Sequence, residues 1–305
     1  MKKNLIFLIL ATLLVSCTGE EFKESQTFIG NKTVDAATLN LGKQVYREYC
    51  MACHGADGGG NGVSSKGMIP APRNLKQGLY KFGWVVAGEL PTDEDFHRII
   101  RYGLKGTAML PWDIQPKQLD AVTQYIKTFA PQVWKKEGNQ IGEQLQLTKD
   151  PYGLARKESA IQHGKEVYHA VANCYSCHRA YATKQEIYDY TKKALGQGLT
   201  DLGDDIYELK LQVSDHIQDD GVVNKYLPPD FTWHEVRSAT TVEELYLRLV
   251  SGVGGAAMPS WKGVLEDDQI WALAYYVRSL MDLKNNPDRN RLMDNLKNQP
   301  AAIQK

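Results

Sequence analysis

Two pentapeptides of the form Cys-x-x-Cys-His lie in separate halves of this 305-residue chain and use four of its five cysteines. Residues 50–54 form the first and residues 174–178 the second. This spacing is the signature of c-type haem attachment, in which two thiols bond to the porphyrin and the adjacent histidine binds the iron. The sequence therefore predicts two haem c groups. Their predicted covalent and iron-binding residues are Cys50, Cys53, His54, Cys174, Cys177 and His178.

Two other kinds of site contain Cys-x-x-Cys, namely zinc sites and thioredoxin-like redox sites. A zinc site built from two such pairs usually separates them by roughly 15 to 20 residues, whereas Cys53 and Cys174 lie in different halves of the chain. A thioredoxin-like motif follows a strand, but the segments before both motifs have a helical pattern. The adjacent histidine in both copies favours haem over these alternatives.

The N-terminus has the composition of a secretory signal. Lys2 and Lys3 precede an apolar stretch at 5–15 that is too short to span a bilayer. The sequence at 14–17, Leu-Val-Ser-Cys, resembles the lipobox of bacterial lipoproteins, which implies cleavage before Cys17 and a lipid on that residue. An ordinary signal peptide or an uncleaved anchor is the alternative. Because haem accounts for the other cysteines, Cys17 is better explained by lipidation than as a free thiol in an oxidising compartment.

The expected location follows from this N-terminus. We predict a lipoprotein signal peptide at 1–16, a polar tether at 17–37, and a periplasmic or extracytoplasmic protein anchored to a bacterial membrane by several acyl chains. No later segment is long and apolar enough for a transmembrane helix. The 36 basic residues balance the 36 acidic ones, so no overall charge favours nucleic acid as a partner.

An internal repeat organises the rest of the chain. The hexapeptide at 41–46 leads into the first haem motif, and a related one at 163–168 leads into the second. Downstream, residues 106–112 match 255–261, and each half then ends in a segment with helical apolar spacing. The matching apolar residues are Leu119, Val122, Tyr125, Ile126 and Phe129 in the first half, and Ile270, Leu273, Tyr276, Val277 and Leu280 in the second.

This order of opening helix, haem motif, methionine loop and closing helix resembles the class I cytochrome c fold. The resemblance implies an all-α protein of two tandem class I cytochrome c domains. We expect them at 38–130 and 158–282, with a linker at 131–157 and a polar tail at 283–305 that frays. In that family the two helices cross with a small residue against an aromatic one. Gly42 and Gly164 fit the small role, and Tyr125 and Tyr276 fit the aromatic role.

A six-coordinate haem needs a second axial ligand, and methionine is the choice that the resemblance implies. We predict Met109 and Met258 as these axial ligands, since they correspond across the repeat and a proline follows each within two residues. The alternative for any methionine is a core-filling role. Competing ligands are Met68, His97, His216 and His234.

The resemblance also gives roles to the segments around each haem. The proline-rich stretches at 70–75 and 227–231 would each offer a backbone carbonyl to the second ring nitrogen of the iron-bound histidine. Arg73 is a candidate partner of a haem propionate or an exposed arginine, and Trp112 and Trp261 are expected pocket walls. The glycine-rich segment at 55–62 would let backbone pass close to the porphyrin edge.

The second half carries an insertion near 181–225, because its interval from histidine to methionine is about 25 residues longer. This stretch is predicted to form one or two surface helices with acidic turns. A solvated insertion is the default interpretation, and a docking element for a partner is the alternative.

Two irons with both axial positions filled leave no site for substrate, so we predict a carrier of single electrons and not an enzyme. The chain resembles cytochromes of the c4 type and the dihaem subunits of membrane oxidases. Its implied partners are redox proteins or other subunits of a respiratory complex, and a tethered shuttle and a fixed subunit both remain open. The alternative is a dihaem enzyme, either peroxidase-like or a small-molecule dehydrogenase. A peroxidatic haem needs an open axial position. Thiosulfate-oxidising enzymes commonly use an axial cysteine, but the haem motifs and the predicted lipidation site use all five cysteines of this chain.

Overall fold

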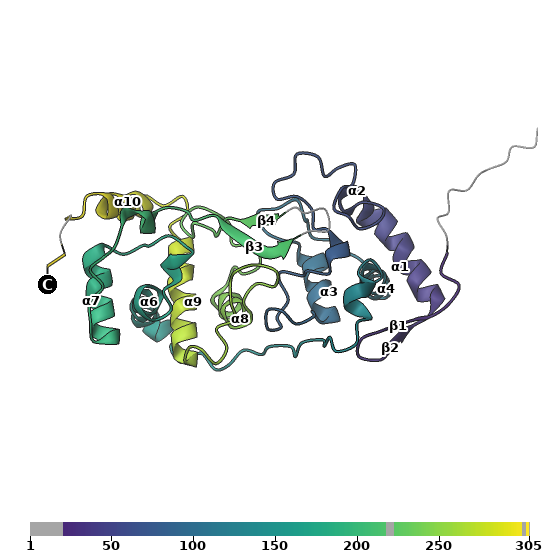
Figure 1. The fold of residues 1–305 in the computed structure, drawn as a ribbon, viewed down its shortest axis with the longest axis horizontal. Coiled ribbons are helices and arrows are strands. Elements are labelled where there is room, and N and C mark those ends of the chain that lie inside the picture. The colour runs from purple at the N-terminus through teal and green to yellow at the C-terminus, as the bar shows by residue number, and fades with distance from the viewer. Residues whose placement is uncertain (1–20, 218–222, 301–302, 305) are drawn as a thin grey trace, which may run out of the picture.

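The computed structural model describes residues 21–217, 223–300 and 303–304, so the predicted signal peptide and Cys17 lie outside the described residues. Two helical modules lie end to end and give an elongated molecule (Figure 1). Residues 21–134 form the first module, and residues 145–300 form the second. Each has its own apolar core. No helix within the described ranges is long and apolar enough to cross a membrane.

The first module is built from one hairpin and five helices. Its elements are β1 (Gln26–Phe28), β2 (Lys32–Val34), α1 (Ala36–Tyr49), α2 (Met51–His54), α3 (Asp93–Tyr102), α4 (Pro116–Lys127) and α5 (Pro131–Trp134). α1 begins at Asp35, whose carboxylate accepts a hydrogen bond from the Thr38 amide. α3 begins with a reciprocal capping box between Thr92 and Asp95. A long loop between α2 and α3 covers residues 55–92 and contains one short 3-10 helix, Leu75–Gln77.

The β1–β2 hairpin packs on the first core, so residues 26–34 are not the free tether that their polar composition suggested. Phe28 and Val34 are buried. The Ile29 amide donates to the Trp134 carbonyl over 2.9 Å. Gly30 and Asn31 adopt positive φ in the connecting turn, a conformation that glycine and asparagine tolerate best. Two buried side chains in nine residues were too few to reveal this hairpin in the sequence.

The opening and closing helices cross at glycine in both modules. A Cβ on Gly42 would lie 2.1 Å from the Ala121 carbonyl oxygen of α4. A Cβ on Gly164 would lie 2.0 Å from the Ala272 carbonyl oxygen. The positions of those Cβ atoms would also be within 2.8 Å of the Tyr125 Cβ and 2.7 Å of the Tyr276 Cβ, respectively. The predicted pairing of a small and an aromatic residue is therefore confirmed.

A buried ion pair ties α3 to α4. The Lys127 ammonium, only 2% exposed, bonds to the Asp93 carboxylate. Lys32 of β2 also pairs with that carboxylate, and the Gln124 amide donates to it over 2.9 Å. Burial opposes ionisation of Asp93, but the charges and hydrogen bonds of Lys127 and Lys32 outweigh it and lower the pKa of Asp93 to about 2. The pair therefore stabilises the module at neutral pH.

Replacing Asp93 with asparagine should lower the free energy of unfolding by about 3 kcal/mol at pH 7, because Lys127 would be buried without its counter-charge. Since the folded-state pKa of Asp93 is depressed, its stabilisation is complete above the unfolded value near 4 and is lost as pH falls towards 2. Denaturant unfolding at pH 7 and pH 3 measures this.

Asp282→Asn is the matched control, because its i,i+4 pair with Arg278 is much more accessible, with the two side chains 47% and 34% exposed, and such pairs contribute less than about 1 kcal/mol. Equal losses in the two variants would contradict a special role for the buried pair.

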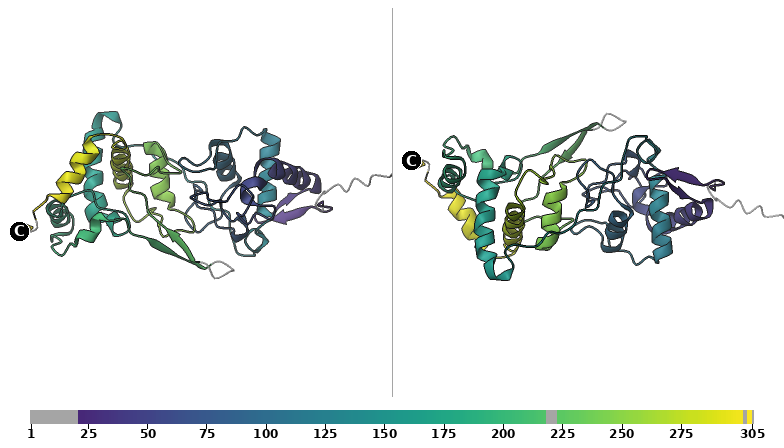
Figure 2. Two further views of the ribbon diagram at one scale, coloured as in Figure 1. Left: turned by 90° about the horizontal axis from the view of Figure 1, so that it is seen from above. Right: turned by 90° about the horizontal axis from the view of Figure 1, so that it is seen from below.

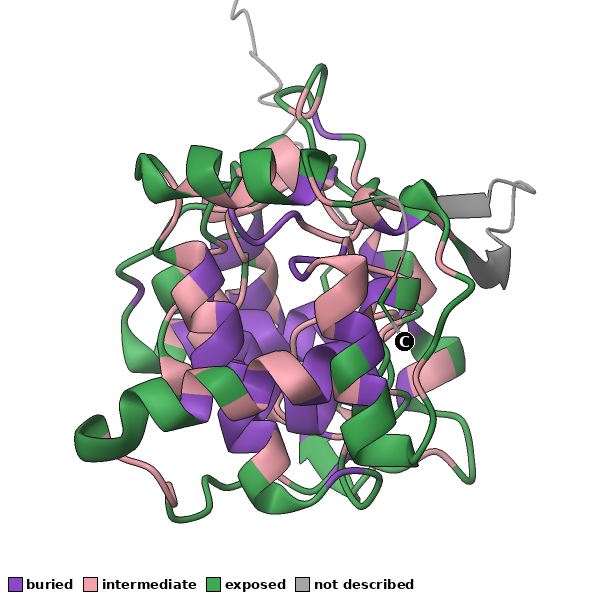
Figure 3. Cartoon of the chain, turned by 90° about the vertical axis from the view of Figure 1, so that its left-hand side faces the viewer, coloured by how far each residue is buried: buried purple, intermediate pink, exposed green. Residues whose placement is uncertain are grey.

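The second module repeats this plan with additions. Its helices and strands are α6 (Lys157–Glu166), α7 (Lys184–Leu195), β3 (Gln212–Ile217), β4 (Val223–Tyr226), α8 (Val242–Ser251), α9 (Asp267–Met281) and α10 (Asp288–Lys297). α6 runs into a π-helical turn at Val167–Val171 before the haem motif. Figure 3 looks onto this module and shows its buried faces gathered in the middle, with exposed faces around them.

The insertion near 181–225 contains one regular helix, α7, and a hairpin that was not predicted. α7 buries Ile187 against the second core. Strands β3 and β4 pair antiparallel, with an irregular register between Val213 and Ile217. Both views in Figure 2 show this hairpin reaching along the side of the molecule towards the first module. The insertion is therefore more than a solvated loop.

The C-terminal segment also differs from expectation, since it forms α10 and does not fray over this length. Leu296 is buried, and Leu292 and Met293 pack on the second core. The Gln299 side chain accepts a hydrogen bond from the Lys184 amide at the start of α7. A few apolar residues at helical spacing were enough to dock a segment whose average composition is polar.

At the junction of the modules, the methionine loop of each module packs on the other module, and it does so at equivalent positions of the repeat. Gly106, in the Met109 loop, packs on Glu235 of the second module, and a Cβ there would lie 2.8 Å from the Glu235 Cβ. Gly255, in the Met258 loop, packs on Leu79 of the first module. A Cβ on Gly255 would lie 3.4 Å from the Leu79 Cβ. Each methionine loop thus lies against the other module, as in an isologous interface.

Arg248 of α8 adds a cross-module link. It is 5% exposed and donates to the carbonyls of Phe82 (3.2 Å) and Gly83 (3.1 Å) in the first module. The Ala87 amide donates back to the Ser251 carbonyl over 2.8 Å. These buried bonds fix how the two modules are oriented.

Candidate functional site

Both Cys-x-x-Cys-His motifs fold into the same tight turn. The histidine amide donates to the carbonyl of the first cysteine over 2.9 Å in each, from His54 to Cys50 and from His178 to Cys174. This turn brings the two thiols and the imidazole of each motif to one place. All four motif cysteines are free of disulfides and half-buried. Burial raises the pKa of Cys50 and of Cys174 to about 12, so these thiols are protonated.

The two imidazoles are oriented by backbone carbonyls of the proline-rich loops. His54 Nδ1 lies 3.1 Å from the Arg73 carbonyl oxygen, and His178 Nδ1 lies 3.4 Å from that of Pro229. With Nδ1–H donating, Nε2 keeps its lone pair for a metal. Burial lowers the pKa of His54 and brings that of His178 to about 4. Both rings are therefore neutral at pH 7, as ligation requires.

A tyrosine in each opening segment fixes the end of the motif, and sequence reasoning gave it no role. The Tyr46 hydroxyl donates to the Gly55 carbonyl over 2.8 Å. The Tyr168 hydroxyl donates to the Arg179 carbonyl over 2.9 Å. Both accepting residues follow the motif histidine directly. The signal was present, because tyrosine closes both of the repeated hexapeptides at 41–46 and 163–168.

The two methionine loops have equivalent backbone geometry. The Met109 carbonyl accepts from the Leu104 amide over 2.8 Å, and the Met258 carbonyl accepts from the Val253 amide over 3.1 Å. A glycine with positive φ, Gly103 or Gly252, ends the preceding helix in each case. A side chain at either glycine would strike the backbone of the loop, which is therefore held closely against the helix end.

Each methionine shares a core rim with the cysteines of its own module. Met109 and Cys50 are half-buried side chains on the first core, and Met258 and Cys174 are their counterparts on the second. Trp112, next in the first loop, packs edge-on against Tyr49, which precedes Cys50, with ring centroids 5.5 Å apart. The axial roles of Met109 and Met258 stay predictions.

Two of the competing ligands have other partners. His97 Nε2 lies 3.2 Å from an Asp120 carboxylate oxygen across α3 and α4. His234 Nδ1 accepts from the Asp230 amide over 3.0 Å. Met68 is half-buried in the 55–92 loop, and the side chain of His216 lies in a stretch that is not described. The structure thus places His97 beside carboxylates and gives His234 a hydrogen-bond partner.

The glycine-rich segment at 55–62 packs closely on protein backbone. A Cβ on Gly60 would lie 2.7 Å from the Pro72 carbonyl oxygen, and one on Gly62 would lie 2.2 Å from that of Ala52. These glycines join the haem motif to the proline-rich loop that orients His54. In the structure these glycines bring the two segments together, and the approach to the porphyrin edge stays a prediction.

The geometry also bears on whether the motif cysteines could form a zinc site. The two motifs belong to separate cores, so their cysteines do not converge on one zinc ion. Within the described part of the chain, no three side chains of His, Cys, Asp or Glu gather as a metal site. Paired thiols, a neutral oriented imidazole and an apolar rim with methionine fit haem c in each module.

Comparison with known proteins agrees with this geometry. The family model described as "Cytochrome C oxidase, cbb3-type, subunit III" matches residues 37–126 and 159–277. Cytochrome c-551 of Bacillus subtilis is 38% identical over 61 residues, which are 19% of this chain and about half (53%) of that protein. A chain of the reducing HAO-like protein complex of Kuenenia stuttgartiensis superposes with a TM-score of 0.59 and 32% identity, covering 79% of this chain and 95% of that one.

Proposed function

Because the chain belongs to the cytochrome c family described as cytochrome c oxidase, cbb3-type, subunit III, we propose that it carries single electrons through two haem c groups as a subunit of a membrane-bound respiratory complex. Members of this family bind haem c covalently and transfer electrons. Bound haem would supply a one-electron couple at its iron. The protein residues hold each porphyrin by two thioethers, orient one imidazole and exclude water with an apolar rim.

The observation that carries the proposal is the repetition of the whole site. In both modules the motif turn, the carbonyl behind the histidine and the methionine loop have the same hydrogen bonds. Two sites built alike support two haems with the same pair of ligands, His54 with Met109 and His178 with Met258. Filled axial positions suit electron transfer and leave no open site for a substrate.

The junction between the modules supports transfer from one haem to the other. Both methionine loops pack against the opposite module, at Glu235 and Leu79. The two loops that orient the histidines also come close together, since Lys81 lies over the ring of Tyr226 at 3.7 Å and Tyr226 is three residues before Pro229. Electrons would therefore enter one module and leave from the other.

A lipid on Cys17 would set the order of the modules relative to the membrane. Eight residues lie between Cys17 and Gln26 at the start of β1, a span of at most roughly 30 Å. The first module would then lie near the membrane and the second would project away, since α10 is at the far end of the molecule (Figure 1). A match with one chain of a multi-protein redox complex supports the role of a subunit.

The test is the number and ligation of the haems in the protein matured in a bacterial periplasm. We expect two haems c per chain by the pyridine haemochrome assay. The oxidised protein should show only low-spin iron by electron paramagnetic resonance and should not bind cyanide or peroxide at low concentration. A high-spin haem with an accessible sixth position would contradict the carrier and favour the dihaem enzyme.

The same preparation tests the anchor. The matured protein should need detergent for release from membranes, and Cys17→Ser should leave it in the soluble fraction with both haems attached. Membrane retention of that variant would contradict lipidation at Cys17.

A further inference from the structure

Asp230 is a buried carboxylate in the proline-rich loop of the second module. Its side chain is only 5% exposed. Oδ1 accepts hydrogen bonds from the Tyr181 hydroxyl over 3.1 Å and from the Thr232 amide over 2.9 Å, and Oδ2 accepts one from Arg179 over 3.0 Å. Burial opposes ionisation of Asp230, but the hydrogen bonds from Thr232 and the charge of Arg179 outweigh it and lower its pKa. Both oxygens are therefore fixed by neighbouring donors.

The residues on either side of Asp230 touch His178, the predicted iron ligand. The Pro229 carbonyl oxygen lies 3.4 Å from His178 Nδ1, and the Phe231 ring stacks on the imidazole with centroids 4.8 Å apart. Arg179, which pairs with Asp230, directly follows His178 in the sequence. The ion pair therefore joins the chain on both sides of the imidazole and fixes the distance from Nδ1 to the carbonyl.

The C-terminal helix α10 holds the same loop. Arg289 Nε donates to the Thr232 hydroxyl over 3.0 Å, and that hydroxyl donates to Asp230 over 2.7 Å. An Arg289 nitrogen also lies 3.7 Å from the Asp230 carboxylate. Two cations thus face one buried carboxylate, one from beside the haem motif and the other from the C-terminal helix.

In the first module a neutral side chain closes the corresponding turn. The Asn74 side chain accepts from the amide two residues later over 3.0 Å, as the Asp230 side chain does over 2.9 Å. The residue after the motif histidine is Gly55 in the first module and Arg179 in the second. Because glycine has no side chain, the ion pair has no counterpart in the first module.

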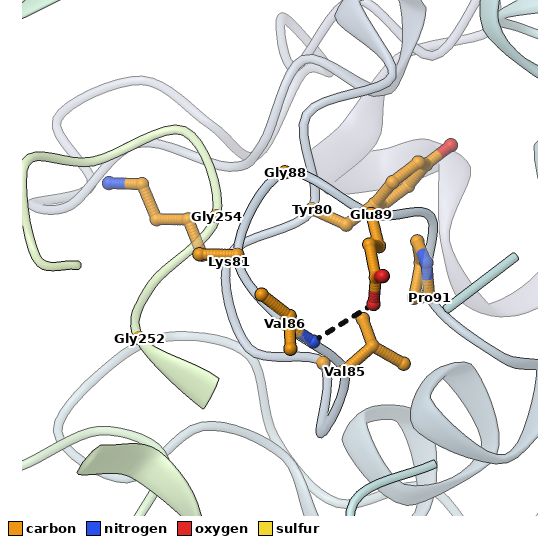
Figure 4. A pocket seen from close by; sticks show the side chains of 11 residues that line it. Tyr80, Lys81, Val85, Val86, Gly88, Glu89, Pro91, Gly252 and Gly254 are labelled. Carbon is orange, nitrogen blue, oxygen red and sulfur yellow. Dashed lines mark hydrogen bonds between the residues drawn. The ribbon is translucent and has the colours of Figure 1, made fainter. Parts of the chain in front are cut away.

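The first loop is supported from outside. It runs on from Asn74 to the junction, where the Tyr80 backbone packs on Gly254 of the second module, and a Cβ on Gly254 would lie 2.4 Å from the Tyr80 carbonyl oxygen. Figure 4 shows Tyr80, Lys81 and Gly254 around a small pocket lined by both modules. The opposite module thus supports the first loop, whereas the contacts of Asp230 that support the second loop come from its own module.

We propose that Asp230 is a positioning residue of the second haem site, and that its pairing with Arg179 and Arg289 sets the potential of that haem separately from the first. This inference rests on the haem attachment proposed above. A hydrogen bond from Nδ1 to a carbonyl makes the imidazole a stronger donor to iron and favours the oxidised state. The carboxylate charge acts in the same direction, because reduction adds an electron, and the two arginines oppose it.

The test compares redox titrations of the two-haem protein with those of Asp230→Asn, Arg179→Gln and the double variant. At a fixed applied potential, Asp230→Asn should raise the ratio of reduced to oxidised iron of the second haem by about tenfold, which is 59 mV for a one-electron couple. A negative charge is lost and the carbonyl is released in that variant. Arg179→Gln should lower the ratio by about threefold, because the carboxylate loses a counter-charge but keeps its bonds to Tyr181 and Thr232.

The double variant distinguishes paired charges from simple loosening of the loop. Its two amide side chains can bond to each other without charge, so the ratio should return to within about twofold of the unmodified protein. Glu166→Gln is the control in the same module, since its partner Lys193 is largely exposed, and its effect should stay below about twofold. The first haem is an internal control whose titration step should not move in any variant.

Shifts of the same sign in the two single variants, unchanged ratios in both, or a double variant that departs further than either would overturn the role of Asp230. Loss of the second haem from Asp230→Asn that the double variant does not restore would also overturn it, because the fold of the loop and not the paired charges would then be limiting. The pyridine haemochrome count of the unmodified protein tests the proposed function separately, so failure of that proposal is distinguishable from failure of this one.

Discussion

Met258→Ala should remove the far-red sulfur-to-iron band of one haem and lower that haem's potential by on the order of 0.1 V or more, within the roughly 0.8 V range that axial ligands span. The thioether stabilises ferrous iron, so its loss favours the oxidised state. Met109→Ala should do the same to the other haem. The double variant should have neither band and two high-spin or water-ligated irons.

Spectra of the oxidised protein and potentiometric titration measure this result. Met68→Ala and Met281→Ala are matched controls, because both are half-buried methionines, one in each module. Both controls should keep two bands. Loss of a band in Met68→Ala, with Met109→Ala unchanged, would transfer the ligand role in the first module to Met68.

Gly42→Val should destabilise the first module by about 3 kcal/mol or more. The Cβ would lie 2.1 Å from a carbonyl oxygen of α4, and a backbone atom cannot move aside without separating the two helices. Gly164→Val should do the same to the second module. Denaturant unfolding followed by far-ultraviolet circular dichroism and by haem absorbance would show one early transition in each variant.

Ala37→Val is the control on the same helix, since Ala37 is exposed on α1. Its cost should be below about 1 kcal/mol, as expected from helix propensity alone. A comparable loss in Ala37→Val would mean that the helix itself, and not the crossing, limits stability.

The sequence predicted two kinds of feature: those formed by a few adjacent residues, and those that occur in both halves of the chain. The haem motifs need only five adjacent residues, and the glycine crossings and methionine loops occur in both halves. The β1–β2 hairpin, the β3–β4 hairpin and α10 were missed because few apolar residues hold each one in place. Tyr46 and Tyr168 were visible in the repeat, but their carbonyl acceptors lie on the far side of the haem motif. The pairing of Gly106 with Glu235 joins residues distant in sequence, which spacing alone does not reveal.

The module boundaries in the structure differ from the predicted ones for a physical reason. Packing of the first core continues through Trp134, which is fully buried, past the predicted end at 130. The connection from there to Leu145, which is buried in the second core, is short. Within it, the Gly142 amide donates to the Leu90 carbonyl over 2.8 Å, so much of the linker runs along the first module.

Each methionine loop packs on the opposite module, and these exchanged contacts make the chain resemble a dimer of similar cytochromes whose subunits have been joined. A short connection turns their association into an intramolecular step with an effective concentration of roughly millimolar or above. The contacts of Gly106 with Glu235 and of Gly255 with Leu79, together with the hydrogen bonds of Arg248, can therefore be weaker than those that free subunits would need. The connection keeps the two modules neighbours at any protein concentration.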